Sequence, residues 1–313
     1  MPKIDAVASL IRAIGTKDYA TMRVITEQLI AHERAAGRDR AATMLERSLR
    51  SWPNTPRMVE LPHAIKPLVW PEATLRRLTD LCLDEDLTAG VNQFLHERRH
   101  YAVIHEAGLP VRKSILLAGP PGNGKTSLAS ALANELNLQF VSVKLYALID
   151  SHMGASSRNL GKVFEHAMTN DCLLFLDEFD AIGSQRIKGA ENSGREMNNI
   201  VTTLLTNIDR LPDTGVLIAA TNMLEAIDPA IQRRFDMKIW MAHPTSAHIA
   251  RYITLYQETH AISFGDASTL ACQLEGSSWS AVEQTCIARH KELILGPHSH
   301  ETGWIGRQDF VAM

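Results

Sequence analysis

The stretch that most constrains the fold is a glycine-rich turn between an apolar run and a helical pattern, ILLAGPPGNGKTSLASALA at residues 115–133. Residues 119–126 match the pattern G-x-x-x-x-G-K-[ST]. Glycines let the backbone wrap closely around an anion, and the N–H groups of the loop and of the following helix point towards it. Because such a match arises by accident in a chain of this length less than about one per cent of the time, a plain flexible turn is the weaker interpretation. The turn therefore predicts a nucleoside triphosphate site.

Two side chains of this turn have specific roles in such a site. Lys125 would bridge the β- and γ-phosphate oxygens, and the Thr126 hydroxyl would ligate Mg²⁺. The residues that we expect to hold the nucleotide are Gly119, Pro120, Pro121, Gly122, Asn123, Gly124, Lys125, Thr126 and Ser127.

An acidic pair follows the apolar run of the segment LLFLDEFD, which begins at residue 173. Ligands of open α/β sheets bind at the carboxyl ends of the strands, where these two acids would lie. Asp177 would hold Mg²⁺ through its water shell, and Glu178 would polarise the water that attacks the γ-phosphate. Such a pair alone is more often a solvated strand end, but its position after the phosphate turn favours a catalytic role.

Five short β-rich runs alternate with helical patterns and predict one sheet. They begin at residues 114, 139, 173, 216 and 237. Most of them are continuously apolar, as in central strands that are covered on both faces. We therefore predict an α/β fold with a doubly wound, five-stranded parallel sheet.

Four parts are predicted along the chain. Apolar residues at helical spacing predict an N-terminal helical unit at 1–51, and five prolines between residues 53 and 71 predict a linker at 52–71. The large α/β subdomain is expected at 72–242, and a C-terminal helical lid, with glycine breaks, at 243–313.

The composition excludes several classes of protein. A net charge of −3 gives no overall basic field, so we expect no tight sequence-independent binding to nucleic acid. The four cysteines form no C-x-x-C pair or metal-ligand cluster, which favours free thiols and a cytoplasmic location. No apolar run approaches the length needed to cross a bilayer, so no membrane association is expected.

These motifs resemble those of the AAA+ ATPases, a group of P-loop NTPases, and more narrowly the AAA group, over about residues 75–313. GPPGNGKT is similar to the Walker A motif of that family, and LLFLDEFDAI to its Walker B motif. IAATN resembles the sensor 1 strand, so Asn222 would orient the lytic water. AIDPAIQRRFD resembles the segment with arginine fingers, which implies that Arg233 and Arg234 reach the nucleotide of a neighbouring subunit. Without the family, adjacent arginines are usually surface ion-pair partners.

The resemblance implies a cofactor, an assembly and an activity. The cofactors would be ATP and Mg²⁺, and the assembly a homo-oligomer, most simply a hexameric ring. The activity would be ATP-driven remodelling of a protein substrate. One group of single-module relatives acts on HORMA-domain proteins, including bacterial versions that regulate antiphage signalling. Three alternatives stay open: a remodelling partner of a separately encoded protease, a nucleic-acid-dependent AAA+ ATPase, and a nucleotide switch without a power stroke.

Two segments depart from the family pattern. The first pore loop of the family has an aromatic-apolar-glycine triplet, and here the triplet is His152, Met153 and Gly154. Histidine packs less strongly than tryptophan or tyrosine, so brief pulling suits this loop better than continuous threading, and an exposed loop histidine is the alternative. In the lid segment LEGSSWSAVEQ, Trp279 and Ala281 replace the glycine and aspartate of the family. We therefore expect Trp279 in a core or an interface.

Overall fold

The computed structural model describes residues 25–26, 29–34, 37–50, 60–70, 76–146, 155–183 and 191–296. The chain divides into two compact units, with boundaries at Gly119/Pro120, Gly124/Lys125 and Met241/Ala242. The first unit contains a sheet, and the second contains the last three described helices together with the loop Pro120–Gly124. Most of the predicted N-terminal unit, the linker up to residue 59 and the end of the predicted lid lie outside the described residues.

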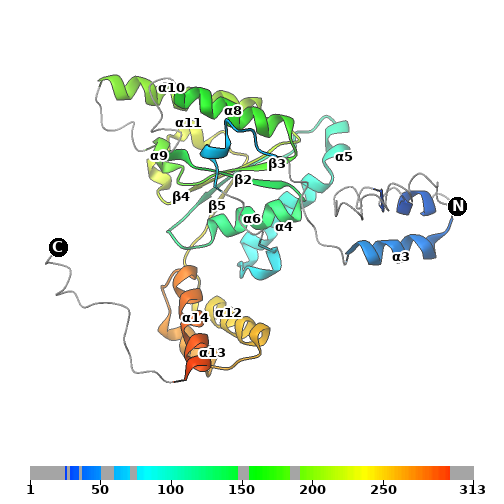
Figure 1. Ribbon diagram of the computed structural model, residues 1–313, viewed down its shortest axis with the longest axis vertical. Helices are drawn as coiled ribbons and strands as arrows, with labels where there is room; N and C mark the ends of the chain where they lie inside the picture. The colour runs from blue at the N-terminus through cyan, green and yellow to red at the C-terminus, as the bar shows by residue number, and fades with distance from the viewer. Residues whose placement is uncertain are drawn as a thin grey trace. The chain divides into compact units, whose positions relative to one another are not determined.

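The first unit is built on a five-stranded parallel sheet in the order β2-β3-β4-β1-β5 (Figure 1). Its strands are β1 (Ser114–Ala118), β2 (Gln139–Val143), β3 (Cys172–Leu176), β4 (Val216–Thr221) and β5 (Met237–Trp240). Every residue of β1, β3 and β4 is buried, which explains why these strands are continuously apolar instead of alternating. The predicted fold class is confirmed.

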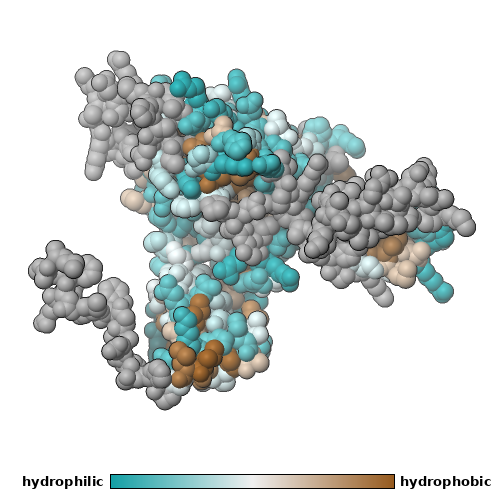
Figure 2. Space-filling view, viewed as in Figure 1, coloured by the Kyte–Doolittle hydropathy of each residue, from teal (hydrophilic) through white to brown (hydrophobic). Residues whose placement is uncertain are grey.

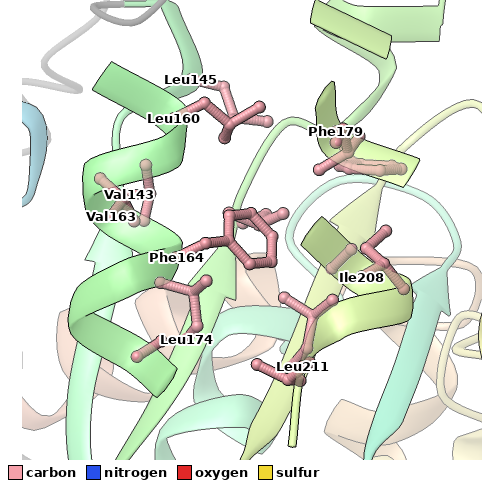
Figure 3. Close-up of a cluster of buried hydrophobic side chains, with 14 of the residues drawn as sticks. Val143, Leu145, Leu160, Val163, Phe164, Leu174, Phe179, Ile208 and Leu211 are labelled. Atoms are coloured by element: carbon pink, nitrogen blue, oxygen red, sulfur yellow. The ribbon is translucent and has the colours of Figure 1, made fainter. Parts of the chain in front are cut away.

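Helices cover both faces of the sheet (Figure 1). Side chains of β3 alternate between the faces: Leu174 and Leu176 pack on one side, Leu173 and Phe175 on the other. The first face is covered by α8 (Ala155–Thr169) and α10 (Glu191–Arg210), and the second by α4 (Glu85–Arg99) and α6 (Lys125–Glu135). Figure 3 shows the first cluster, in which Phe164 of α8 is fully buried among leucine and isoleucine side chains.

The remaining elements of the first unit are short or peripheral. They are α3 (Asp39–Arg50), η1 (Lys66–Leu68), η2 (Leu78–Asp80), α5 (Tyr101–Glu106), α9 (Asp180–Gly183), η4 (Leu224–Ala226) and α11 (Pro229–Gln232). In the N-terminal part, α3 supplies Ala42 to a small apolar cluster with Ile30.

The end of the proline-rich segment packs onto the sheet. Ile65, Leu68 and Val69 are buried in the cluster of the first face. Val69 forms an antiparallel bridge with Val143 of β2, with hydrogen bonds on both sides of it. Part of the segment that we assigned to a linker therefore contributes to the core.

The second unit contains α12 (Ser246–His260), α13 (Ala267–Gln273) and α14 (Trp279–Leu295), and each helix begins after a side-chain cap, from Thr245, Asp266 and Ser278. Its core consists of Ile249, Ile253, Ala271, Val282 and Cys286. Apolar side chains are also exposed on this unit (Figure 2), and the large ones are Leu255, Ile287, Leu293, Ile294 and Leu295. Within the described residues, no helix has the length and apolarity to cross a membrane.

Candidate functional site

The phosphate loop begins where β1 ends. Gly119 has a φ of +149°, and a Cβ at this position would overlap the backbone carbonyl oxygen of Met241. Met241 is held there because its N–H donates to the Ala118 carbonyl oxygen at 2.7 Å, which continues the pairing of β1 with β5. Only glycine fits both this conformation and this space, so the backbone path of the loop requires glycine at position 119.

The apex of the loop packs on the start of α14 within the second unit. Gly122 has a φ of +75°, and a Cβ there would lie 3.0 Å from the Ser278 hydroxyl oxygen. Its carbonyl oxygen accepts the Ser280 N–H at 3.0 Å, and Ser278 caps α14 by accepting the Ala281 N–H. Trp279 packs on Tyr252, with a ring-centroid distance of 5.5 Å, beside the core of the unit.

Lys125 is the first residue of α6 and is only 7 % exposed. Its Nζ donates to the Gly119 carbonyl oxygen at 2.7 Å. Burial lowers the pKa of Lys125, while the negative charges of Asp177 and Asp180 oppose this shift. The lysine side chain therefore lies against Gly119, at the start of α6, where the helix dipole would stabilise a bound anion.

Thr126 of helix α6 contacts Asp177, the residue that follows β3. The Thr126 hydroxyl donates to Oδ2 of Asp177 at 3.1 Å, and Asp177 Oδ1 accepts the N–H of Glu178 at 2.9 Å. A hydroxyl and a carboxylate oxygen are ligands that suit Mg²⁺, so the residues present fit this ion. Glu178 is exposed and has a left-handed φ of +52°, which is uncommon for a residue other than glycine.

Asn222 follows β4, the strand between β3 and β1, so it belongs to the same edge of the sheet as the acids. Its side chain is exposed, and its N–H donates to Oδ1 of Asp180 at 3.2 Å. Asp180 is a residue to which sequence reasoning gave no role. The only signal was the third acid in the segment D-E-F-D.

Arg233 and Arg234 lie at the amino-terminal ends of the strands, opposite to the end where the acids lie. They precede β5, and the Arg234 carbonyl oxygen accepts the hydroxyl of Ser114, the first residue of β1, at 3.4 Å. Asp236 fixes this edge, since its Oδ2 accepts the N–H and the hydroxyl of Ser114 at 3.0 and 2.8 Å. At about 3.3 Å per residue, β1 separates this edge from the phosphate loop by about 13 Å. The structure does not bring Arg233 and Arg234 to Asp177 and Glu178 of the same chain.

The two arginines differ in their contacts. Nη1 of Arg234 contacts both carboxylate oxygens of Asp209, at 2.6 and 2.7 Å. Arg233 is exposed at the end of α11, and among the described residues it forms no ion pair.

Comparisons with known proteins agree with these motifs. The family description "ATPase family associated with various cellular activities (AAA)" matches residues 115–243. An uncharacterized AAA family ATPase of Sinorhizobium fredii, y4kL, is 35 % identical over 305 residues, which cover 94 % of this chain and 90 % of that protein. The chain belongs to the AAA ATPase family. It is therefore an ATP hydrolase, as the phosphate loop and the acidic pair predicted.

This AAA ATPase is also similar to parts of larger proteins. The ATP-dependent zinc metalloprotease FtsH 3 of Phytoplasma mali is 31 % identical over 235 residues, which cover 73 % of this chain and 37 % of that protein. The 26S proteasome regulatory subunit 10B homolog A of Arabidopsis thaliana is 37 % identical over 142 residues, 44 % of this chain and 36 % of that protein. The chain thus spans little more than a third of these two relatives.

Two predicted features of the AAA ATPase lie outside the described residues. The first is the triplet of the pore loop, His152, Met153 and Gly154, and the second is the end of the lid predicted at 243–313, from residue 297 onward. Both stay predictions.

Proposed function

We propose that this AAA ATPase remodels a protein substrate as a ring of identical subunits, and that each ATP site is completed by an arginine of the neighbouring subunit. One observation carries the proposal. Arg233 and Arg234 lie at the start of β1, whereas the phosphate loop lies at its end, on the same side of the sheet as Asp177 and Glu178. If Arg233 or Arg234 stabilises the γ-phosphate in the transition state, it would therefore act on the nucleotide of another copy.

Different residues of one chain would bind the phosphates, hold Mg²⁺ and activate the attacking water. The loop Gly119–Gly124 and Lys125 bind the phosphates, and Thr126 with Asp177 would hold Mg²⁺. When bound, the ion neutralises charge on the β- and γ-phosphate oxygens. Glu178 takes a proton from the attacking water, and Asn222 orients that water. Among the described residues, no hydrogen bond or ion pair engages the Glu178 carboxylate, and only the backbone N–H of Glu178 contacts Asp177.

Arg233 is the better candidate for the group supplied in trans. The guanidinium of Arg234 forms an ion pair with Asp209, whereas Arg233 is exposed and forms no ion pair among the described residues. The exposed apolar side chains at the end of α14 also support assembly, because contiguous apolar surface often marks an interface. The ring that we propose is a hexamer, and its location is the cytoplasm.

The substrate class is a finer proposal. We propose a HORMA-domain protein that regulates a bacterial antiphage system. A specific observation favours a second candidate, a remodelling partner of a separate protease: two relatives are named as a metalloprotease and as a proteasome regulatory subunit.

A substrate trap tests these proposals. Glu178→Gln keeps the phosphate loop and should hold ATP without cleaving it, so that a bound substrate is retained. Pull-down in the presence of ATP should recover a protein that the variant Lys125→Ala, which cannot bind ATP, does not recover. Recovery of a HORMA-domain protein favours the first candidate, and recovery of protease subunits the second. DNA-stimulated turnover that weakens with salt would instead indicate the nucleic-acid-dependent class.

A further inference from the structure

Asp180 connects two strand ends that are far apart in the sequence. It follows β3 by four residues and begins α9, and its Oδ1 accepts the Thr221 hydroxyl at 3.0 Å and the Asn222 N–H at 3.2 Å. A backbone hydrogen bond next to it, from the Phe179 N–H to the Ala220 carbonyl oxygen at 2.8 Å, keeps the two segments in register. The carboxylate is therefore held directly against the end of β4.

Thr221 relays this contact into the turn that follows. The residue is fully buried, its hydroxyl donates to Asp180, and the same oxygen accepts the Met223 N–H at 3.0 Å. Three successive residues, Thr221, Asn222 and Met223, are thus fixed directly or through one hydroxyl by a single carboxylate oxygen. Hydrogen bonds to a charged acceptor are about twice as strong as neutral ones, so these contacts restrain the turn strongly.

Asn222 depends on this restraint because its own side chain is exposed and follows directly after the last residue of β4. The direction of its side chain is set by the backbone of residues 221–223. We infer that Asp180 is a positioning residue: its carboxylate holds the turn after β4 so that Asn222 presents its side chain amide to the attacking water. The inference rests on the proposed role of Asn222 in ATP hydrolysis.

A competing role for Asp180 would act through its charge. The negative charge of Asp180 reaches Lys125, where it opposes the effect of burial on the pKa of the lysine. Positioning needs an acceptor oxygen, whereas an electrostatic role needs the negative charge. Asp180→Asn separates the two roles, because the amide oxygen can still accept both hydrogen bonds and carries no charge.

The test measures kcat and KM for ATP with the full chain. We expect Asp180→Ala to lower kcat about 10- to 100-fold, because a small misplacement of a positioned group has effects of this size, and to change KM by less than about threefold. Asp180→Asn should keep kcat within about threefold of the wild type. Glu225→Ala is the matched control, since Glu225 is an exposed acid on η4 in the same segment, and it should leave both constants unchanged.

Two further variants separate loss of positioning from misfolding of Asp180→Ala. Thr221→Val keeps the shape of the buried side chain, removes the relay, and should lower kcat at least about threefold. In chains that already contain Asn222→Ala, adding Asp180→Ala should lower kcat by no more than about twofold, because residues that act through one another are not additive.

The outcomes separate this inference from the proposed function. A wild-type chain without ATPase activity at any protein concentration would overturn the proposed function. If the wild type is active, an unchanged kcat in Asp180→Ala or in Thr221→Val overturns the inference alone. An Asp180→Asn chain as slow as Asp180→Ala would also overturn it, in favour of the electrostatic role.

Discussion

Gly119→Ala tests the claim that the path of the phosphate loop, and not its flexibility, requires glycine. The new Cβ would occupy a backbone with φ of +149° and would overlap the Met241 carbonyl oxygen. That oxygen cannot move freely, because the Met241 N–H is paired with Ala118 at 2.7 Å. The overlap must therefore be relieved by shifting β1 against β5 or by opening the loop.

The cost follows from two separate terms. Backbone in a region that is almost restricted to glycine costs about 1 to 3 kcal/mol for another residue, and forcing an extra methyl group into a packed site costs about 1 to 3 kcal/mol. The sum, about 2 to 6 kcal/mol, is a large share of the 5 to 15 kcal/mol by which domains are typically stable. At about 2 to 4 °C per kcal/mol, the unfolding midpoint should fall by at least about 4 °C.

Thermal unfolding followed by circular dichroism, with a titration of a fluorescent ATP analogue, measures both consequences. Gly161→Ala is the matched control: Gly161 lies within α8, has no left-handed φ, and has open space where the Cβ would be. It should stabilise the chain by up to about 1 kcal/mol and leave nucleotide binding unchanged. If Gly119→Ala unfolds at the wild-type temperature and binds the analogue normally, the steric argument is wrong.

Three other perturbations have expected outcomes. Glu178→Gln should lower the rate of ATP hydrolysis about 10²- to 10⁴-fold while ATP affinity stays within about threefold, and a drop in affinity equal to the drop in rate would contradict its role as a base. Phe164→Ala should lower the free energy of unfolding by about 3 to 5 kcal/mol, measured in urea, because the ring is fully buried between α8 and the sheet, and a loss below about 1 kcal/mol would refute that packing. Burial raises the pKa of the Cys172 thiol to about 12 and that of the Cys286 thiol to about 11. At pH 8 a disulfide reagent should therefore modify the exposed Cys272 first, and Cys172 and Cys286 only after unfolding in urea. Rapid modification of Cys172 or Cys286 in the native chain would contradict their burial.

The sheet could be predicted from the sequence because its central strands are buried on both faces. Each predicted strand begins within one residue of its position in the structure, as β3 does at Cys172 instead of residue 173. The phosphate loop could be predicted for a different reason. Its residues are contiguous, so the geometry that binds an anion is encoded in one short segment.

Contacts between distant segments could not be predicted in this way. Asp180 meets Thr221 across 41 positions, and Arg234 meets Asp209 across 25. No local pattern records which acid faces which strand end. The same holds for the proline-rich segment, where Val69 pairs with Val143. The prolines predicted an irregular backbone, but burial depends on an apolar surface that another part of the chain provides.

Mixed assemblies test the central claim, that an ATP site is completed by an arginine from a second copy of the chain. One variant is Glu178→Gln, and the other combines Arg233→Ala with Arg234→Ala; each alone should be nearly inactive. When subunits are mixed in equal amounts and allowed to assemble, random pairing gives up to about a quarter of the sites an intact glutamate and a neighbour with intact arginines. The account predicts that ATPase activity returns towards about a quarter of the wild-type value on mixing. Activity that stays at the mean of the two separate variants, in assemblies proven to contain both, would contradict it.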